Sequence, residues 1–183
     1  LRIPAGFCGV VGFRPSPGTV PNEVRTVGLN PYSVLGPMGR SVADAALLLG
    51  VLADDDARDP FSHGFDPTLL DPLPDVDLST LNVAVSEDLG VVPIDNGIRK
   101  TFQNRVKTFR HVFAQADDRD PPFDDDLHEA FEIIRATNFV AAHGERLKNN
   151  RDLLGPNVIE NTERANKYSA SDVAWANLQQ TRY

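Results

Sequence analysis

The single cysteine is the first candidate for nucleophilic chemistry. Cys8 is the only cysteine of the chain, and a thiol becomes a strong nucleophile only where a base or a positive environment converts it to the thiolate. The residues around it are mostly small and apolar, and none of them is a histidine. We therefore expect Cys8 to be a buried packing residue, and within this chain one cysteine cannot form a disulfide or a cysteine metal cluster.

Histidines and acidic runs are the candidates for metal binding. The four histidines are His63, His111, His128 and His143. No two of them have the spacing of about three to five residues that places two imidazoles on one helix face. The acidic runs at 54–56 and 124–126 lack the alternating ligands, the glycine and the distal glutamate of an EF-hand loop. We interpret both runs as solvated loops and helix N-terminal charge, and we expect no metal site.

Phosphate-containing ligands are not indicated either. The glycine-rich N-terminal stretch lacks the Gly-Lys-Ser of a phosphate-cradling loop, so we expect no bound nucleotide. The formal net charge is -8 and the pI is about 4.9, while the 18 Lys and Arg residues are scattered along the chain. A negative summed field repels phosphate backbones. We therefore expect no direct contact between this chain and nucleic acid.

Two glycine-containing blocks carry the most specific signal. The first block, residues 1–15, reads Leu-Arg-Ile-Pro-Ala-Gly-Phe-Cys-Gly-Val-Val-Gly-Phe-Arg-Pro, and the second, residues 34–49, contains Gly-Pro-Met-Gly-Arg-Ser-Val. The first resembles the stretch after the catalytic serine in the amidase signature family, where Gly-Gly-Ser leads into an arginine and then Phe-Cys-Gly. The second resembles the family's Gly-Pro-Met-Ala-Arg-Ser-Val segment. Looser similarity continues to about Tyr183.

This resemblance implies where the catalytic groups lie. A serine nucleophile would stand directly before Leu1, with a second serine at a cis peptide bond and a lysine base further upstream, so no catalytic residue is expected in this chain. Arg2 would lie close to the nucleophile, where its planar guanidinium can brace the nucleophile loop. Gly36, Pro37 and Met38 would lie beside the catalytic core and line the acyl pocket, since methionine adapts to irregular apolar groups. A strand end that packs against the next helix is the alternative for these three residues.

The implied reaction is hydrolysis of a carboxamide to a carboxylic acid and ammonia. The serine attacks the carbonyl, backbone amides of the glycine-rich loop hold the oxyanion, ammonia leaves, and water releases the acid. The resemblance therefore implies that no cofactor is required. The same fold serves as the amidase subunit of glutamyl-tRNA amidotransferase, so a transamidase with partner subunits is a second hypothesis. A third, from another class, is a non-catalytic fragment that only packs or binds, because this chain lacks the expected triad.

Local patterns predict the elements that position the two blocks. Residues 7–14 alternate small and apolar side chains and predict a buried strand, and residues 32–38 predict a second short strand or extended segment. Ser41 followed by Asp44 is typical of a capping box at the start of a helix. The buried face of that helix is expected to consist of Val42, Ala45, Ala46 and Leu49.

The rest of the chain alternates strand and helix patterns after an acidic, proline-rich connector over residues 54–80. Residues 81–86 predict a strand, 95–116 an amphipathic helix, and 125–149 a long helix. The other expected helices cover residues 157–167 and 171–182. Residues 113–119 depart from the Leu-Gly-Ala and β-strand that the family has after its first long helix, which puts an edge strand there in doubt. The alternation predicts an α/β fold, here the central fragment of the amidase-signature fold, a mixed β-sheet flanked by helices.

Composition and the chain ends complete the expectations. The chain is 41% hydrophobic and 24% charged, as in globular proteins, and its longest apolar stretch, residues 45–53, is far shorter than the roughly 20 residues that span a bilayer. A single cysteine is compatible with a reducing cytoplasm, where we expect this protein. Without an initiator methionine, leader or final helix stop, we expect residues 1–183 to be one partial domain of a larger amidase-signature domain. The expected partners are a small-molecule amide and either a second copy or amidotransferase subunits.

Overall fold

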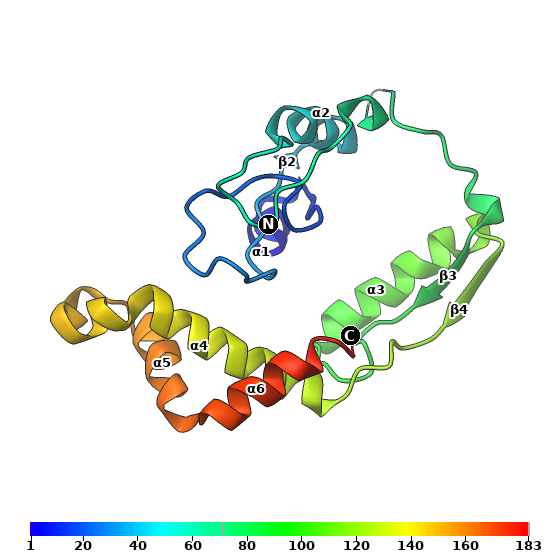
Figure 1. The fold of residues 1–183 in the computed structure, drawn as a ribbon. Coiled ribbons are helices and arrows are strands. Elements are labelled where there is room, and N and C mark those ends of the chain that lie inside the picture. Colours follow the sequence, from blue (N-terminus) through cyan, green and yellow to red (C-terminus); the bar gives the residue numbers. More distant parts are fainter. Residues whose placement is uncertain (71, 183) are drawn as a thin grey trace. The chain divides into compact units, whose positions relative to one another are not determined.

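The computed structural model describes residues 1–70 and 72–182. They form two compact units, Leu1–Asp75 and Val76–Tyr183. The elements are helices with two small two-stranded sheets, one antiparallel and one parallel, so the predicted α/β class is confirmed (Figure 1). Within the described ranges, none of the helices has both the length and the apolar character needed to cross a membrane.

The first unit begins with a short helix where a strand was predicted. Helix α1 spans Arg2–Cys8, and it ends at Gly9, whose φ of 62° is left-handed and suits glycine. Only Val11–Gly12, strand β1, remains extended and paired. The strand prediction for residues 7–14 was therefore wrong in its first half, because small apolar residues suit both a helix face and a strand.

The expected burial of Cys8 was also wrong for the described structure. Cys8 is exposed, and it lies in the last turn of α1, a helix that buries only Ala5. With seven residues, α1 has just two turns, so the side that packs against the unit is narrow and Cys8 falls outside it.

The second strand and second helix follow the prediction closely. Strand β2, Met38–Gly39, pairs antiparallel with β1 in the register Val11 to Gly39 and Gly12 to Met38. Helix α2 spans Val42–Leu52 and starts with the predicted capping box. The Ser41 hydroxyl accepts from the Asp44 N–H, and the Asp44 carboxylate accepts from the Ser41 N–H, both at 3.1 Å.

One residue of the predicted α2 face is not buried. Ala45, Ala46 and Leu49 are buried as expected, whereas Val42 is 61% exposed. Val42 is the first helical residue, so no preceding helical turn covers its side chain.

The second unit opens with a strand, helix and parallel strand. Strand β3 spans Asn82–Val85, helix α3 spans Asn96–Phe109, and strand β4 spans Gln115–Asp118. The Asp95 carboxylate caps α3 by accepting from two backbone N–H groups. The strands are parallel in the register Asn82 to Gln115 through Val85 to Asp118. Figure 1 shows β3 and β4 side by side.

The doubt about an edge strand at residues 113–119 is thereby corrected, and so is the end of the predicted helix. The helix does not continue to residue 116, because the chain leaves α3 through a 3-10 turn at Arg110–Val112 and the Ala114 N–H then donates to the Leu81 carbonyl. Long-range pairing with β3 therefore decides the conformation of a segment whose polar residues give no strand pattern.

Three helices complete the second unit. Helix α4 spans Asp125–Asn149, as predicted. Asp124 caps it, which confirms the prediction that the acidic run at 124–126 places negative charge at a helix N-terminus. Helices α5, Pro156–Arg164, and α6, Ala170–Gln179, pack against α4. The core between α4 and α6 consists of Ala130, Ile133, Ile134 and Ala176, covered by Tyr168, Val173 and Trp175.

We predict that Ser41→Ala destabilises the purified protein by about 1 kcal/mol, because the first turn of α2 loses a side-chain acceptor for a free N–H. Urea unfolding monitored by circular dichroism measures this change. The control is Ser171→Ala in the first turn of α6, since Ser171 is exposed and its side chain makes no described hydrogen bond. The two variants should differ; equal unfolding midpoints would contradict the capping role.

Candidate functional site

The first unit brings the two glycine-containing blocks together. Strands β1 and β2 belong to different blocks and pair with each other, and just beyond the pair the Phe13 N–H donates to the Pro37 carbonyl at 3.1 Å. The sheet therefore places Gly36 and Pro37 beside the residues that follow α1.

Leu1 lies close to two glycines, with its side chain near Gly36 and its backbone near Gly12. A Cβ atom on Gly36 would lie 2.4 Å from the Phe13 carbonyl oxygen and 3.0 Å from Leu1 Cδ1. A Cβ atom on Gly12 would lie 2.7 Å from Ala5 Cβ and 3.1 Å from the Leu1 carbonyl oxygen. Only glycine fits at both places, because these distances are shorter than van der Waals contact. The start of α1 is thus packed against both strands.

The predicted pocket residues occupy different environments. Pro37 is fully buried, Gly36 is half-buried, and Met38 is 44% exposed. Gly36 and Pro37 therefore serve packing between the strands, while a large part of Met38 is open to contact. Their place in an acyl pocket stays a prediction.

Arg2, the predicted brace, is exposed and opens α1. In the part of the chain that the structure describes, its side chain makes no hydrogen bond or ion pair. The structure thus brings Gly36 and Pro37 to Leu1 but brings none of them into a polar contact with Arg2. The bracing role also stays a prediction.

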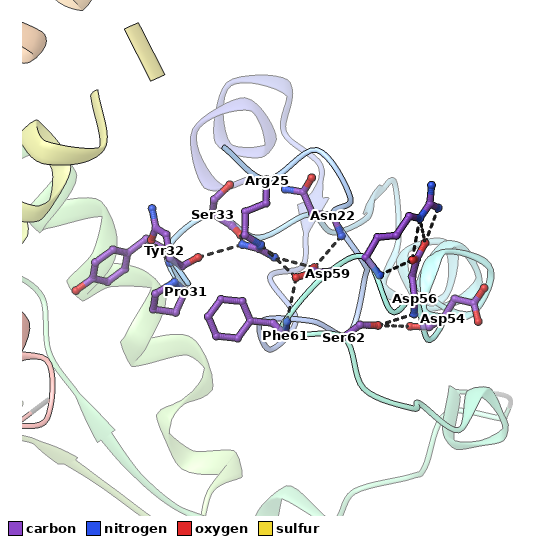
Figure 2. A network of polar contacts seen from close by, with 12 residues as sticks. Asn22, Arg25, Pro31, Tyr32, Ser33, Asp54, Asp56, Asp59, Phe61 and Ser62 are labelled. Atoms are coloured by element: carbon purple, nitrogen blue, oxygen red, sulfur yellow. Dashed lines mark hydrogen bonds and ion pairs between the residues drawn. The ribbon is translucent and has the colours of Figure 1, made fainter. Parts of the chain in front are cut away.

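An ion pair that sequence reasoning missed ties this unit together. Arg25 and Asp59 lie 34 positions apart, and their side chains are 4% and 0% exposed. Arg25 Nε and Nη2 donate to the two Asp59 oxygens at 3.3 and 2.9 Å, and the guanidinium lies 5.1 Å from the centre of the Phe61 ring (Figure 2). No local sequence pattern links the two residues. Asp59 lies in the acidic connector, where the sequence suggests solvated carboxylates.

Hydrogen bonds from the Arg25 side chain lower the pKa of Asp59 to about 2, and hydrogen bonds from the backbone N–H groups of Phe61 and Asn22 act in the same direction against the effect of burial. The neighbouring pair differs. Arg58 lowers the pKa of Asp56 to about 2 as well, but its own side chain is 68% exposed. Exposed pairs contribute little to stability, so Asp59 is the carboxylate with a structural role here.

The second unit holds a polar cavity of about 600 Å³ at the carboxyl ends of β3 and β4. Its polar groups mostly bind one another. The Ser86 hydroxyl donates to Asp120 at 2.6 Å, and Arg110 forms an ion pair with Asp118 that lowers the pKa of that carboxyl. The described partners of the Ser86 hydroxyl are Asp120 and the Leu89 N–H, and no histidine or lysine bonds to it.

Other candidate chemistry is likewise not assembled. Among the residues that the structure describes, no group of three or more His, Cys, Asp and Glu side chains could hold a metal ion. The described hydrogen bonds of histidine and lysine side chains go to the Gly64 carbonyl and to Glu145, and none involves a serine or cysteine.

Comparison with known proteins accounts for the packing of the two blocks. The sequence model of the family described as Amidase matches residues 1–178, and therefore includes both blocks and most of the second unit. The chain belongs to the amidase signature family.

The similar proteins include acylamidases and amidotransferase subunits. An acylamidase of Rhodococcus erythropolis is 27% identical over 96% of this chain and 37% of its own length. One subunit of the glutamyl-tRNA(Gln) amidotransferase of Chlorobium phaeobacteroides is 30% identical over 89% of this chain and 36% of its own length. The crystal structure of a bacterial aryl acylamidase of the amidase signature family matches 98% of this chain with a TM-score of 0.79 at 24% identity. The chain spans little more than a third of the length of these proteins.

We predict that Gly36→Ala destabilises the purified protein by about 1–3 kcal/mol, since a methyl group would overpack the contact with Phe13 and Leu1. Thermal or urea unfolding measures the effect. Gly64→Ala is the matched control, because a Cβ atom there would meet nothing within 4 Å, and it should change stability by less than about 0.5 kcal/mol. Equal stability of the two variants would show that the close approach is absent.

Proposed function

We propose that this chain is the central part of a serine amidase that hydrolyses a carboxamide to a carboxylic acid and ammonia. The proposed nucleophile is a serine directly before Leu1, preceded by two glycines, with the second serine and the lysine further upstream. The observation that carries the proposal is the packing of Leu1 against Gly12 and Gly36, two glycines contributed by the two blocks. A nucleophile joined to Leu1 would be held in a fixed position by this packing.

The proposed chemistry divides between the nucleophile and its surroundings. The serine attacks the carbonyl carbon, ammonia departs after protonation, and water releases the acid. Backbone amides of the glycine loop before Leu1 stabilise the oxyanion. In this chain Arg2 braces the loop, and Gly36, Pro37 and Met38 border the acyl group. The reaction needs no cofactor.

Exposed apolar side chains support the idea that both units belong to a larger domain. Leu47 and Val51 on α2 are 74% and 75% exposed, and Ile98 on α3 is 63% exposed. Apolar surface of this kind is usually covered in a complete protein. We therefore propose that residues 1–183 belong to one amidase-signature domain, with a small-molecule amide as substrate and the cytoplasm as its compartment.

A transamidase is the second candidate. The 30% identity to one of the amidotransferase subunits favours it, whereas the similarity to acylamidases favours a stand-alone hydrolase. The two differ in what they require: a stand-alone amidase releases ammonia from simple amides, and a transamidase works only together with its partner subunits.

The nucleophile is tested in the parent protein, meaning the full protein that contains this chain. We expect a fluorophosphonate probe to modify the serine directly before Leu1, as located by tandem mass spectrometry, and the parent to release ammonia from aryl or aliphatic amides. The isolated 183-residue chain should match the buffer blank. Robust turnover by the isolated chain, or probe attachment within residues 1–183, would contradict the proposed placement.

In the parent protein we expect Arg2→Ala to lower kcat far more than it raises KM. A displacement of the nucleophile by about 1 Å costs on the order of 100-fold in rate, and a group that acts on transition-state geometry affects kcat. Arg2→Lys should restore only part of the rate, because an ammonium lacks the planar fork. The control is Arg105→Ala, whose side chain is exposed on α3 and makes no described polar contact. An unchanged kcat in Arg2→Ala would make Arg2 an ordinary surface residue.

A further inference from the structure

We propose that Arg25 and Asp59 are positioning residues for the nucleophile, acting through residues 22–35, which we call the strap. The inference rests on the proposed function. The strap leads directly into Gly36, which lies close to Leu1. Arg25 lies near the start of the strap. Neither residue touches the reacting atoms in this proposal.

Asp59 anchors the beginning of the strap. Its two oxygens accept four hydrogen bonds: two from the Arg25 guanidinium, one from the Asn22 N–H at 2.8 Å, and one from the Phe61 N–H at 3.0 Å (Figure 2). A buried carboxylate needs this degree of compensation. The connector is thereby joined to the strap at Asn22 and at Arg25.

Arg25 fixes the end of the strap with its remaining nitrogen. Nη1 donates to the Ser33 carbonyl at 2.7 Å and to the Asn30 carbonyl at 3.0 Å, and Figure 2 shows the Ser33 contact reaching away from Asp59. Arg14, which follows Phe13, adds a bond from Nη2 to the Pro31 carbonyl at 3.1 Å. The strap is therefore held shortly before Gly36. Because Ser33 and Gly36 are so close in the chain, a shift of the backbone at Ser33 would displace Gly36 as well.

The guanidinium has little capacity left for a substrate. Its bonds to Asp59, Asn30 and Ser33 use four of the five N–H donors of an arginine, and its side chain is 4% exposed. An arginine that bound the carboxylate or amide of a substrate would need exposed donors. Arg25 instead provides a rigid planar joint, a property that lysine lacks.

Energetics also favour a positional role. Buried ion pairs contribute little net stability relative to well-packed apolar residues, because desolvation offsets their attraction. What such a pair specifies is a single arrangement of the groups around it. In this unit that arrangement includes Gly36 against Leu1, so the geometry of the pair is transmitted to the residue after the proposed nucleophile.

The test compares Arg25→Lys and Asp59→Asn with the control Arg58→Lys in the parent protein. Arg58 lies in the same connector and pairs with Asp56 and with the strap residue Glu23, but its side chain is 68% exposed, so that solvent screens both pairs. We expect kcat and the rate of fluorophosphonate inactivation to fall at least about tenfold in both pair variants, with KM within about twofold, as for a nucleophile displaced by less than about 1 Å. The control should match the parent. Circular dichroism checks that each variant is folded. If one of the two pair variants does not fold, the other alone tests the inference.

Hydrogen exchange provides a readout that does not depend on activity. The Phe13 N–H, which donates to Pro37, should exchange faster in Arg25→Lys and Asp59→Asn than in the parent and in Arg58→Lys. Folded pair variants with parental kcat, inactivation rate and Phe13 exchange would overturn the inference. A parent that hydrolyses no amide and reacts with no fluorophosphonate would overturn the proposed function instead, while the exchange of Phe13 would still decide whether the pair positions the strap.

Discussion

The close approach of Gly36 and Gly12 to Leu1 is the contact that holds the first unit in register. A carbon added to Gly36 would lie 2.4 Å from the Phe13 carbonyl oxygen and 3.0 Å from Leu1 Cδ1, and one added to Gly12 would lie 2.7 Å from Ala5 Cβ and 3.1 Å from the Leu1 carbonyl oxygen. Such contacts leave one relative position for the start of α1 and the two strands, because neither backbone can move closer and any separation would break the β1–β2 pairing. In the proposed function, a nucleophile joined to Leu1 would be held by these contacts, as a catalytic group requires.

The ion pair of Arg25 and Asp59 supports these contacts from a distance, through residues 22–35. Residues 13–37 form neither helix nor strand. A segment of this kind owes its shape to side chains that bond with its backbone. Arg25 alone satisfies two carbonyl groups in this stretch. Exposed pairs of the same residue types, such as Arg58 with Asp56, lie beside it and contribute less, since solvent screens them.

The second unit uses different means to reach a defined structure. Helix caps at Asp95, Asp124 and Ser169 begin its three longest helices, and small side chains let α4 and α6 pack closely around Ile133. Its strands pair across an intervening helix, which is the connection that parallel strands require. Several acidic residues that have no catalytic spacing thus serve as caps and ion-pair partners.

Local signals in the chain were sufficient for a good part of this structure. The capping box of Ser41 and Asp44, the long helix over residues 125–149, the strand near residue 82 and membership in the amidase signature family could all be predicted, because each depends on residues a few positions apart or on a contiguous motif. Other features became known only from the folded chain. Residues 2–8 form a helix, Cys8 is exposed, residues 115–118 form a strand, and Arg25 pairs with Asp59. The strand and the ion pair depend on partners that are far away in the chain, and a long-range contact leaves no periodic trace in the residues that make it. The helix and the exposure of Cys8 could not be predicted because small apolar residues suit both a helix face and a strand.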